Sequence, residues 1–313
     1  MMILCCGEAL IDMIPEPTLQ GAQGFVPHCG GAVMNTAVAL GRLGAPTGLF
    51  TGLSDDMFGQ QLTAHLRASH VDLSLAAVSS RPTTLAFVKL VDGKASYSFF
   101  DENSAGCLLQ LADLPNVPTH VSALFFGGIS LAVEPAAETY ATLLEREKRD
   151  RVVMLDPNIR EAFIADPERY RGRLDRMLAQ TDIIKVSDED LDWLIPLNMP
   201  SAEKAAMLMN RGPRLVVETR GSAGVLAYLP NGTEVAIAAE SVDIVDTVGA
   251  GDTFNAGFLC KLRELGMLDV EILPHITPEV LRSALTFASK VAGISVSRKG
   301  ANPPWAREVY ESV

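Results

Sequence analysis

Residues 246–257 (DTVGAGDTFNAG) place two glycines and a carboxylate at the expected start of a helix. Gly249 and Gly251, on either side of Ala250, allow the backbone to turn sharply and to approach a ligand closely. The apolar residues that follow recur at helical spacing, so a helix is expected to begin at this turn. The N–H groups of its first turn lack partners within the helix and lie at the positive end of its dipole. The segment therefore predicts a site for an anion, above all a phosphate.

Asp252 lies inside this set of donors. A site that only binds phosphate gains nothing from a negative charge there, whereas a phosphoryl-transfer site can use it to take the proton from an attacking hydroxyl. The alternative is a tight β-to-α turn in which Asp252 only favours the helix N-terminus. Two other phosphate motifs are excluded, because G-x-G-x-x-G would need glycine where Phe254 stands and G-x-x-x-x-G-K-[ST] does not occur.

Residues 30–37 (GGAVMNTA) form a second glycine turn ahead of a helical segment. One interpretation is a flexible turn followed by a helix with an ordinary polar residue. The other is a site for a polyhydroxyl ligand, in which Gly30 and Gly31 let the ligand reach the backbone and Asn35 offers a donor and an acceptor. Asp12, just past the first expected strand, adds an acceptor suited to sugar hydroxyls.

The composition is that of a globular protein with a sizeable core, since 48% of the 313 residues are hydrophobic and 20% are charged. The net charge of −12 and the pI near 4.9 argue against nucleic acid and anionic membrane surfaces as partners. The first residues lack a basic leader, and the longest apolar run, residues 123–133, is too short to cross a bilayer. The five cysteines have no metal-like spacing and are expected to be reduced. We therefore expect a cytoplasmic protein.

Short apolar segments alternate with helical patterns along the chain. The expected strands are residues 3–6, 124–126, 152–155, 183–186 and 215–218. This alternation is typical of an α/β fold with a mostly parallel central sheet covered by helices on both faces, and ligands bind beyond the carboxyl ends of such strands. Polar residues do follow three of the strands, at 156–160, 185–187 and 219–221.

Residues 83–100 break this pattern. They alternate like strands on both sides of Asp92-Gly93, a two-residue hairpin signal. Together with residues 15–29 they could form a small β-lid over the sheet. We therefore expect a single α/β domain over residues 1–313, with a lid from about residues 12–30 and 82–104.

The two glycine motifs resemble those of the ribokinase-like (PfkB) sugar kinases, a family that includes ribokinase, fructokinase and adenosine kinase. They are Gly-Gly-Ala-x-x-Asn at 30–35 and Asp-Thr-x-Gly-Ala-Gly-Asp at 246–252, and the resemblance continues to residues 298–303 (RKGANP). Within the family, residues 6–12 (CGEALID) and 82–88 (PTTLAFV) look most like the bacterial fructokinases. So does Asp156-x-Asn158-x-Arg160, which 2-keto-3-deoxygluconate kinases share.

The resemblance implies transfer of the γ-phosphoryl group of ATP to a sugar hydroxyl, with Asp252 as base and Gly249, Ala250 and Gly251 as the anion hole. It implies a sugar site formed by Asp12, Gly30, Gly31 and Asn35, with Arg160 near the transferring phosphate or the substrate. It implies a nucleotide site formed by Asn158, Lys185, Ser187, Thr219, Gly221, Gly224 and Ser289, with Ser289 on the adenine side. Phe99 and Phe100 either fill the lid or cover the sugar and exclude water.

Family members need Mg²⁺ bridging the phosphates, and many are activated by K⁺ in a loop that corresponds here to Asp246, Val248 and Gly300. Two departures from the family pattern leave the cations open. Ser187 and Asp190 stand where many members have an Asn and a Glu that position metal-bound waters. Pro304 stands where ribokinase offers a serine to the cation loop. Lid hairpins in this family often pair, which predicts a homodimer.

Three functions fit these residues: a fructokinase, a family kinase acting on 2-keto-3-deoxygluconate or a nucleoside, and a non-catalytic regulatory member. The intact residues 249–252 argue against the last. Keto-deoxygluconate kinases typically supply an arginine from the covering strand, whereas residues 98–103 (SFFDEN) are apolar and then acidic here. A substrate carboxylate would be repelled by Asp101 and Glu102, although Arg160 could offset this if it points at the sugar. We therefore expect D-fructose, phosphorylated at its 6-hydroxyl.

Overall fold

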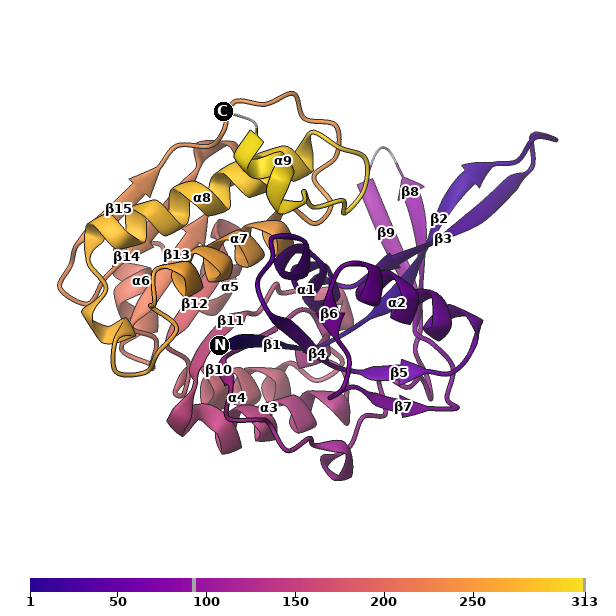
Figure 1. Ribbon diagram of the computed structural model, residues 1–313, viewed down its shortest axis with the longest axis horizontal. Coiled ribbons are helices and arrows are strands. Elements are labelled where there is room, and N and C mark those ends of the chain that lie inside the picture. Colours follow the sequence, from indigo (N-terminus) through magenta and orange to yellow (C-terminus); the bar gives the residue numbers. More distant parts are fainter. Residues whose placement is uncertain (92–93, 312–313) are drawn as a thin grey trace.

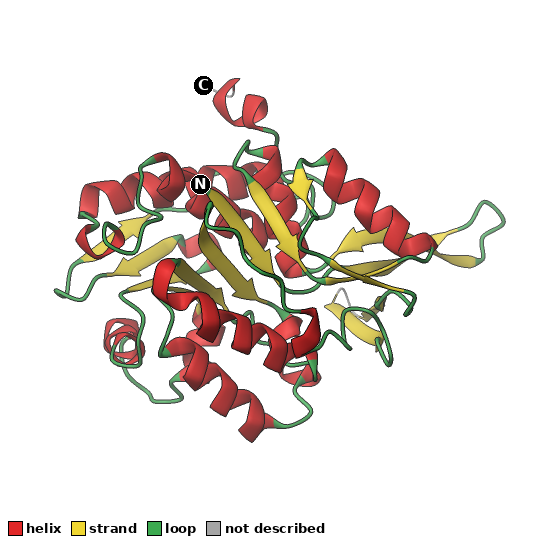
Figure 2. Ribbon diagram, turned by 60° about the horizontal axis from the view of Figure 1, so that its bottom comes forward, coloured by secondary structure: helices red, strands yellow, loops and turns green. Residues whose placement is uncertain are grey.

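The computed structural model describes residues 1–91 and 94–311 and has a central sheet with helices on both faces (Figures 1 and 2). In spatial order, the nine strands of this sheet among the described residues are β15 (Glu234–Ile237), β14 (Val225–Tyr228), β13 (Leu215–Thr219), β12 (Ile183–Ser187), β11 (Val152–Asp156), β10 (Val121–Gly127), β1 (Met2–Cys6), β4 (Thr47–Phe50) and β6 (Val71–Asp72). The strands from β13 to β6 pair in parallel, whereas β13–β14 and β14–β15 pair antiparallel. The predicted mostly parallel α/β sheet is confirmed.

Helices cover the sheet in two layers because its strands are apolar on both faces. In β1, Ile3 and Cys5 pack into one buried cluster while Leu4 and Cys6 pack into the other. The first cluster is covered by α1 (Ala32–Arg42), α2 (Met57–Ala68), α7 (Ala250–Glu264), α8 (Pro278–Val296) and α9 (Ala306–Glu311). The second is covered by α3 (Ala136–Glu147), α4 (Pro167–Leu178), α5 (Asp188–Leu194) and α6 (Ser201–Met209).

A second sheet projects from one end of this body, beside α1 and α2 (Figure 1). Its strands, in order, are β3 (Gln23–Gly30), β2 (Leu10–Pro17), β8 (Leu85–Val91) and β9 (Lys94–Phe100). A small pair of β5 (Gly52–Ser54) and β7 (Ala77–Ser79) lies nearby. Apart from the first two residues of β2, the four strands fall within the segments predicted to form a lid, and we call them the lid sheet. The predicted turn at Asp92-Gly93 lies outside the described residues, and the assignment of one domain stays a prediction.

Residues 235–245 are rich in β-branched residues, but the strand β15 ends at Ile237. Ile244 and Val245 lie outside the strands and are 65% and 61% exposed. Among the described residues, the structure has no helix of the length and apolar character that a membrane crossing requires.

Candidate active site

Two glycines shape the turn before α7 in different ways. Gly249, the residue before the helix, has φ of 74°, and a Cβ there would lie 2.9 Å from that of Ala301. At Gly251 a Cβ would lie 3.3 Å from Nζ of Lys185, in the space in front of the first turn. The predicted helix thus begins at Ala250, and side chains are kept away from its N–H groups.

Asp252 is buried in the first turn of α7. Its Oδ2 accepts a hydrogen bond of 2.9 Å from Nδ2 of Asn35, which belongs to the first turn of α1. Burial, which disfavours the charged form, raises the pKa of Asp252 to about 7, with Asn35 opposing the shift. The negative charge of Asp156 raises this pKa further and the positive charge of Lys185 lowers it. The carboxyl group therefore titrates near neutrality.

A buried ion pair lies beneath this turn, at the ends of β11 and β12. Nζ of Lys185 lies 3.0 Å from Oδ2 of Asp156, and the same oxygen accepts a hydrogen bond of 2.7 Å from Nδ2 of Asn255. Asn255 follows Asp252 by three residues on α7, so the pair is joined to the helix that carries the carboxylate. The arrangement holds an ammonium group beside Gly251, where an anion at the helix N-terminus would lie.

A cavity of about 610 Å³ opens at the same turn. Ala250 and Gly251 line one end of it, and the predicted nucleotide residues Thr219, Gly221, Gly224 and Ser289 also line it. Apolar groups from the loop after β15 and from both helices complete the walls: Val242, Ile244, Phe254, Ala292 and Val296. The hydroxyl of Ser289 is buried and has no hydrogen-bond partner among the described residues. A ligand polar group could supply that partner, because buried hydroxyls are normally bonded.

The predicted sugar residues meet between the lid sheet and α1. Asp12 on β2 is opposite Ala86 on β8, which is opposite Phe99 on β9, so Asp12 and Phe99 share a face of the lid sheet. A Cβ at Gly30 would overlap the Asp12 carboxylate. Burial raises the pKa of Asp12 to about 6. Gly31 has φ of 107° and precedes α1.

Two aromatic residues at this face were not predicted. The ring of Phe99 packs on that of Phe163, which follows β11, with centroids 4.6 Å apart. The pKa of Tyr97 is raised by burial and then by the charge of Asp12, and the charge of Arg160 lowers it. Phe100 lies on the opposite face, where its ring is 5.3 Å from that of Phe87 and it is 58% exposed. Of the two interpretations given for these phenylalanines, a cover for the sugar is therefore open to Phe99 alone, because alternate residues of a strand face opposite ways.

The predicted cation-loop residues are brought together. Asp246 accepts hydrogen bonds from the N–H groups of Val248, at 3.0 Å, and Gly300, at 2.9 Å. This carboxylate thus joins the segment before α7 to the loop after α8.

Asp190 and Ser187 have local roles. Each side chain accepts a hydrogen bond from the backbone N–H of the other, which caps the start of α5. The second carboxylate oxygen of Asp190 accepts a hydrogen bond of 2.9 Å from the N–H of Ile159. The N–H of Asn158 donates to Asp156, and Arg160 donates to the carbonyl of Ile159. Within residues 1–91 and 94–311, no three His, Cys, Asp or Glu side chains are grouped to hold a metal ion.

Known proteins resemble this chain both in sequence and in fold. Residues 1–307 match the family described as pfkB family carbohydrate kinase. The chain is 50% identical to a fructokinase from Rhizobium leguminosarum bv. trifolii over 282 residues, which cover 90% of this chain and 86% of that protein.

Solved structures agree with this assignment of the fold. Fructokinase from Xylella fastidiosa with bound ATP has a TM-score of 0.90 and 29% identity, covering 99% of this chain and 97% of that one. A double mutant of fructokinase from Vibrio cholerae O395, in the form with fructose, ADP and potassium ion bound, has a TM-score of 0.85 and 26% identity. It covers 99% of this chain and 97% of its own.

Proposed function

This chain belongs to the pfkB family of carbohydrate kinases, and from that premise we propose that it transfers the γ-phosphoryl group of ATP to the 6-hydroxyl of D-fructose. The observation that carries the proposal is the buried carboxylate of Asp252 within the N-terminal turn of α7. An anion-binding turn with its own base has the two parts that phosphoryl transfer to an alcohol requires.

Asp252 acts as the general base in this proposal. Asn35 occupies Oδ2, so we assign Oδ1 to the sugar hydroxyl. The hydroxyl oxygen forms a bond to the γ-phosphorus while the bond to the bridging oxygen of ADP breaks, and Asp252 takes the proton. A pKa of about 7 suits this role, because a base is most effective when its pKa lies near the working pH. The N–H groups of Gly249 and Gly251 and the ammonium of Lys185 would stabilise the transferring group.

The lid sheet supports a neutral sugar. Asp12 presents a carboxylate acceptor, while Phe99 and Phe163 supply an apolar cover that excludes water. Beyond Phe99 the chain continues into Asp101 and Glu102, whose charge helps to raise the pKa of Asp101. This acidic pair favours D-fructose over a sugar acid. The fructokinases named above support the same acceptor.

ATP fits the cavity at Ala250 and Gly251, with its adenine among the apolar residues of the wall and Ser289 within reach of a base nitrogen. Mg²⁺ typically binds through substrate phosphates with few protein carboxylates, and we propose that it enters with ATP in that way. Both oxygens of Asp190 already accept backbone N–H groups, so Asp190 is not assigned as its ligand. For K⁺ we propose carbonyl groups of the loop joined by Asp246, Val248 and Gly300.

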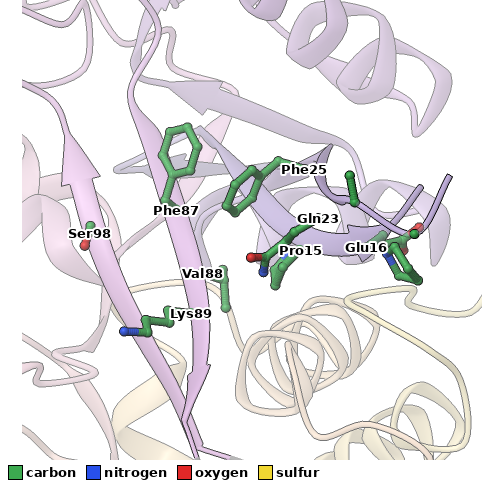
Figure 3. Close-up of a pocket in the computed structure, with 11 residues that line it drawn as sticks. Pro15, Glu16, Gln23, Phe25, Phe87, Val88, Lys89 and Ser98 are labelled. Atoms are coloured by element: carbon green, nitrogen blue, oxygen red, sulfur yellow. The ribbon is translucent and has the colours of Figure 1, made fainter.

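The face of the lid sheet opposite Asp12 and Phe99 supports a homodimer. Phe25 and Phe87 lie edge to face with centroids 5.0 Å apart, and Phe100 extends the row. Phe25 is 43% exposed, and its ring lies beside that of Phe87 (Figure 3). Both residues line a groove of about 610 Å³, as does Lys89. We propose that a second copy of the chain packs against this aromatic row. A Phe100→Glu variant should elute as a monomer with an unchanged far-UV spectrum, and a wild-type monomer would contradict the assignment.

A panel of acceptors tests the activity itself. D-fructose, D-glucose, D-ribose, adenosine and 2-keto-3-deoxygluconate are each assayed for ADP release with MgATP, and ³¹P NMR then locates the phosphate on the product. We expect fructose to give the highest rate and the product to carry its phosphate on O6. Release of ADP with none of these acceptors above the rate without sugar would contradict the proposal.

A further inference from the structure

Glu8 belongs to the segment after β1 and has no role in the chemistry described so far. Its Oε1 accepts a hydrogen bond of 2.9 Å from the N–H of Ala32, the first residue of α1. Its Oε2 accepts a hydrogen bond of 3.2 Å from the N–H of Ser130, in the short helix η2 (Ile129–Leu131) after β10. One carboxylate thus supplies the missing cap of two helices, because the residues that precede them are glycines without capping side chains.

The backbone is shaped to enclose this carboxylate. Gly128 has φ of 70°, and a Cβ there would overlap the carboxylate oxygens of Glu8. Gly31 has φ of 107°, and a Cβ there would lie 2.9 Å from the carbonyl oxygen of Glu8. That carbonyl oxygen also accepts a hydrogen bond of 3.2 Å from the N–H of Met34. Two positive-φ glycines, one from each neighbouring segment, are therefore fitted around one acidic side chain.

No Lys or Arg among the described residues forms an ion pair with this carboxylate, and burial raises its pKa. Backbone N–H groups and the dipole of α1 are what stabilise its charge. A partly buried charge without a cation is costly, and an apolar side chain could fill the space between two helices more simply. The position of α1 is the property that this arrangement controls most directly.

We infer that Glu8 is a positioning residue for phosphoryl transfer, because it fixes the first turn of α1 and, through Asn35, the base Asp252. Asn35 is the fourth residue of α1, so a shift of the helix start moves its amide directly. That amide holds Oδ2 of Asp252, and Gly30 and Gly31 of the sugar site lie at the same turn. Both oxygens of Glu8 are occupied by N–H groups, so Glu8 acts through α1 and not as a sugar ligand.

The inference rests on the proposed function, and its test starts from the acceptor that the wild-type enzyme phosphorylates fastest. In Glu8→Gln, the amide can accept from only one of the two N–H groups and turns its NH₂ toward the other. A displacement of the reacting groups on the order of 1 Å costs about 100-fold in rate, so we expect kcat/KM for the acceptor to fall by about that factor. The KM for ATP should stay within about twofold, because none of the residues that line the nucleotide cavity belongs to α1.

The pH profile separates this role from mere support of the fold. The groups around Asp252 are Asn35 of α1, Asp156 of β11, Lys185 of β12 and Glu8, and the Glu8 charge raises the pKa of Asp252. Asn35 lowers this pKa and outweighs the Glu8 charge, so a displaced Asn35 amide should move the acid limb of kcat/KM to higher pH in Glu8→Gln. Gly128→Ala displaces the carboxylate but keeps its charge, so it should lower kcat/KM with a movement in the same direction.

Leu208→Ala is the control for stability, since Leu208 is buried in the cluster on the other face of the sheet. A Glu8→Gln enzyme whose Tm falls as in this control, with wild-type kcat/KM and acid limb, would show that Glu8 only supports the fold. A rise in the KM for ATP by the same factor as the fall in kcat/KM for the acceptor would also overturn the inference, because it would indicate a general disturbance of the active site. Failure of fructose as acceptor would refute the proposed substrate alone, since the same comparison is made with whichever acceptor is active.

Discussion

Asp252→Asn should separate catalysis from stability in one substitution. Asparagine keeps the shape of the side chain and can still accept from Asn35, but it cannot take a proton. Loss of a general base usually costs about 10²–10⁴-fold, so we expect kcat to fall by that amount. ATP affinity should be unchanged or higher, because a negative charge near the γ-phosphate is removed.

The same substitution should stabilise the fold, and the sign depends on pH. Burial raises the pKa of Asp252 from its ordinary value of 3.8 to about 7. A carboxyl whose pKa is raised in the folded state favours folding while both states are protonated, and that advantage is lost as the pH rises through about 7. At pH well above 7 the ionised group therefore destabilises the protein, by roughly 4 kcal/mol at most. Asparagine avoids this cost, so the gain should be largest in alkaline buffer and should vanish below about pH 4.

Two assays check these expectations. Steady-state kinetics across pH should show wild-type kcat/KM rising with pH and levelling above about 7, with roughly a tenth of the plateau at pH 6. Urea unfolding at two pH values should show the stability gain of the variant. Asp175→Asn is the matched control, because Asp175 is exposed on α4 and pairs with Arg211. A variant with full activity, or a gain in stability equal at low and high pH, would refute the reasoning.

Three further substitutions follow from the same geometry. Gly251→Val places bulk beside Lys185 and against an incoming phosphate, so kcat should fall by about 100-fold or more at nearly unchanged Tm; an unfolded variant would show that this glycine serves the fold alone. Ser289→Ala removes a buried hydroxyl without a partner, so the free energy of unfolding should not fall, while the Kd for ATP should rise by about 2- to 10-fold in calorimetry; unchanged affinity would place Ser289 away from the nucleotide. Asp12→Asn should raise the KM for the sugar by about 10- to 100-fold, and in the wild type that KM should rise as the pH falls through about 6, because protonation removes the charged acceptor; a KM that does not depend on pH would argue against a sugar contact.

The parts of the site that sequence could predict are those written in a few consecutive residues. The helix start at Ala250 follows from two glycines and the apolar spacing after them, and the positive φ of Gly249 shows why glycine is needed there. The parallel character of the sheet is also local in origin, since short apolar strands separated by helices pair in parallel. The alternation of side chains along β9 would have predicted that Phe99 and Phe100 lie on opposite faces of the lid sheet.

The contacts between distant segments were beyond prediction. Asn35 and Asp252 are far apart in the chain, and nothing in either motif shows that the amide of one binds the carboxylate of the other. The same holds for Glu8, whose partners Ala32 and Ser130 offer only backbone N–H groups and so leave no trace in residue type. Asp190 carried the charge of a metal-site residue, but its oxygens are used in capping α5 and in binding Ile159.

The central claim is that the enzyme phosphorylates a neutral ketohexose, and the ratio of kcat/KM for D-fructose to that for 2-keto-3-deoxygluconate tests it most directly. Asp101 and Glu102 would repel a substrate carboxylate placed near them, so we predict a ratio of at least about 100 in favour of fructose. A ratio below one would contradict the account, and it would indicate that Arg160 turns toward the substrate and binds its carboxylate.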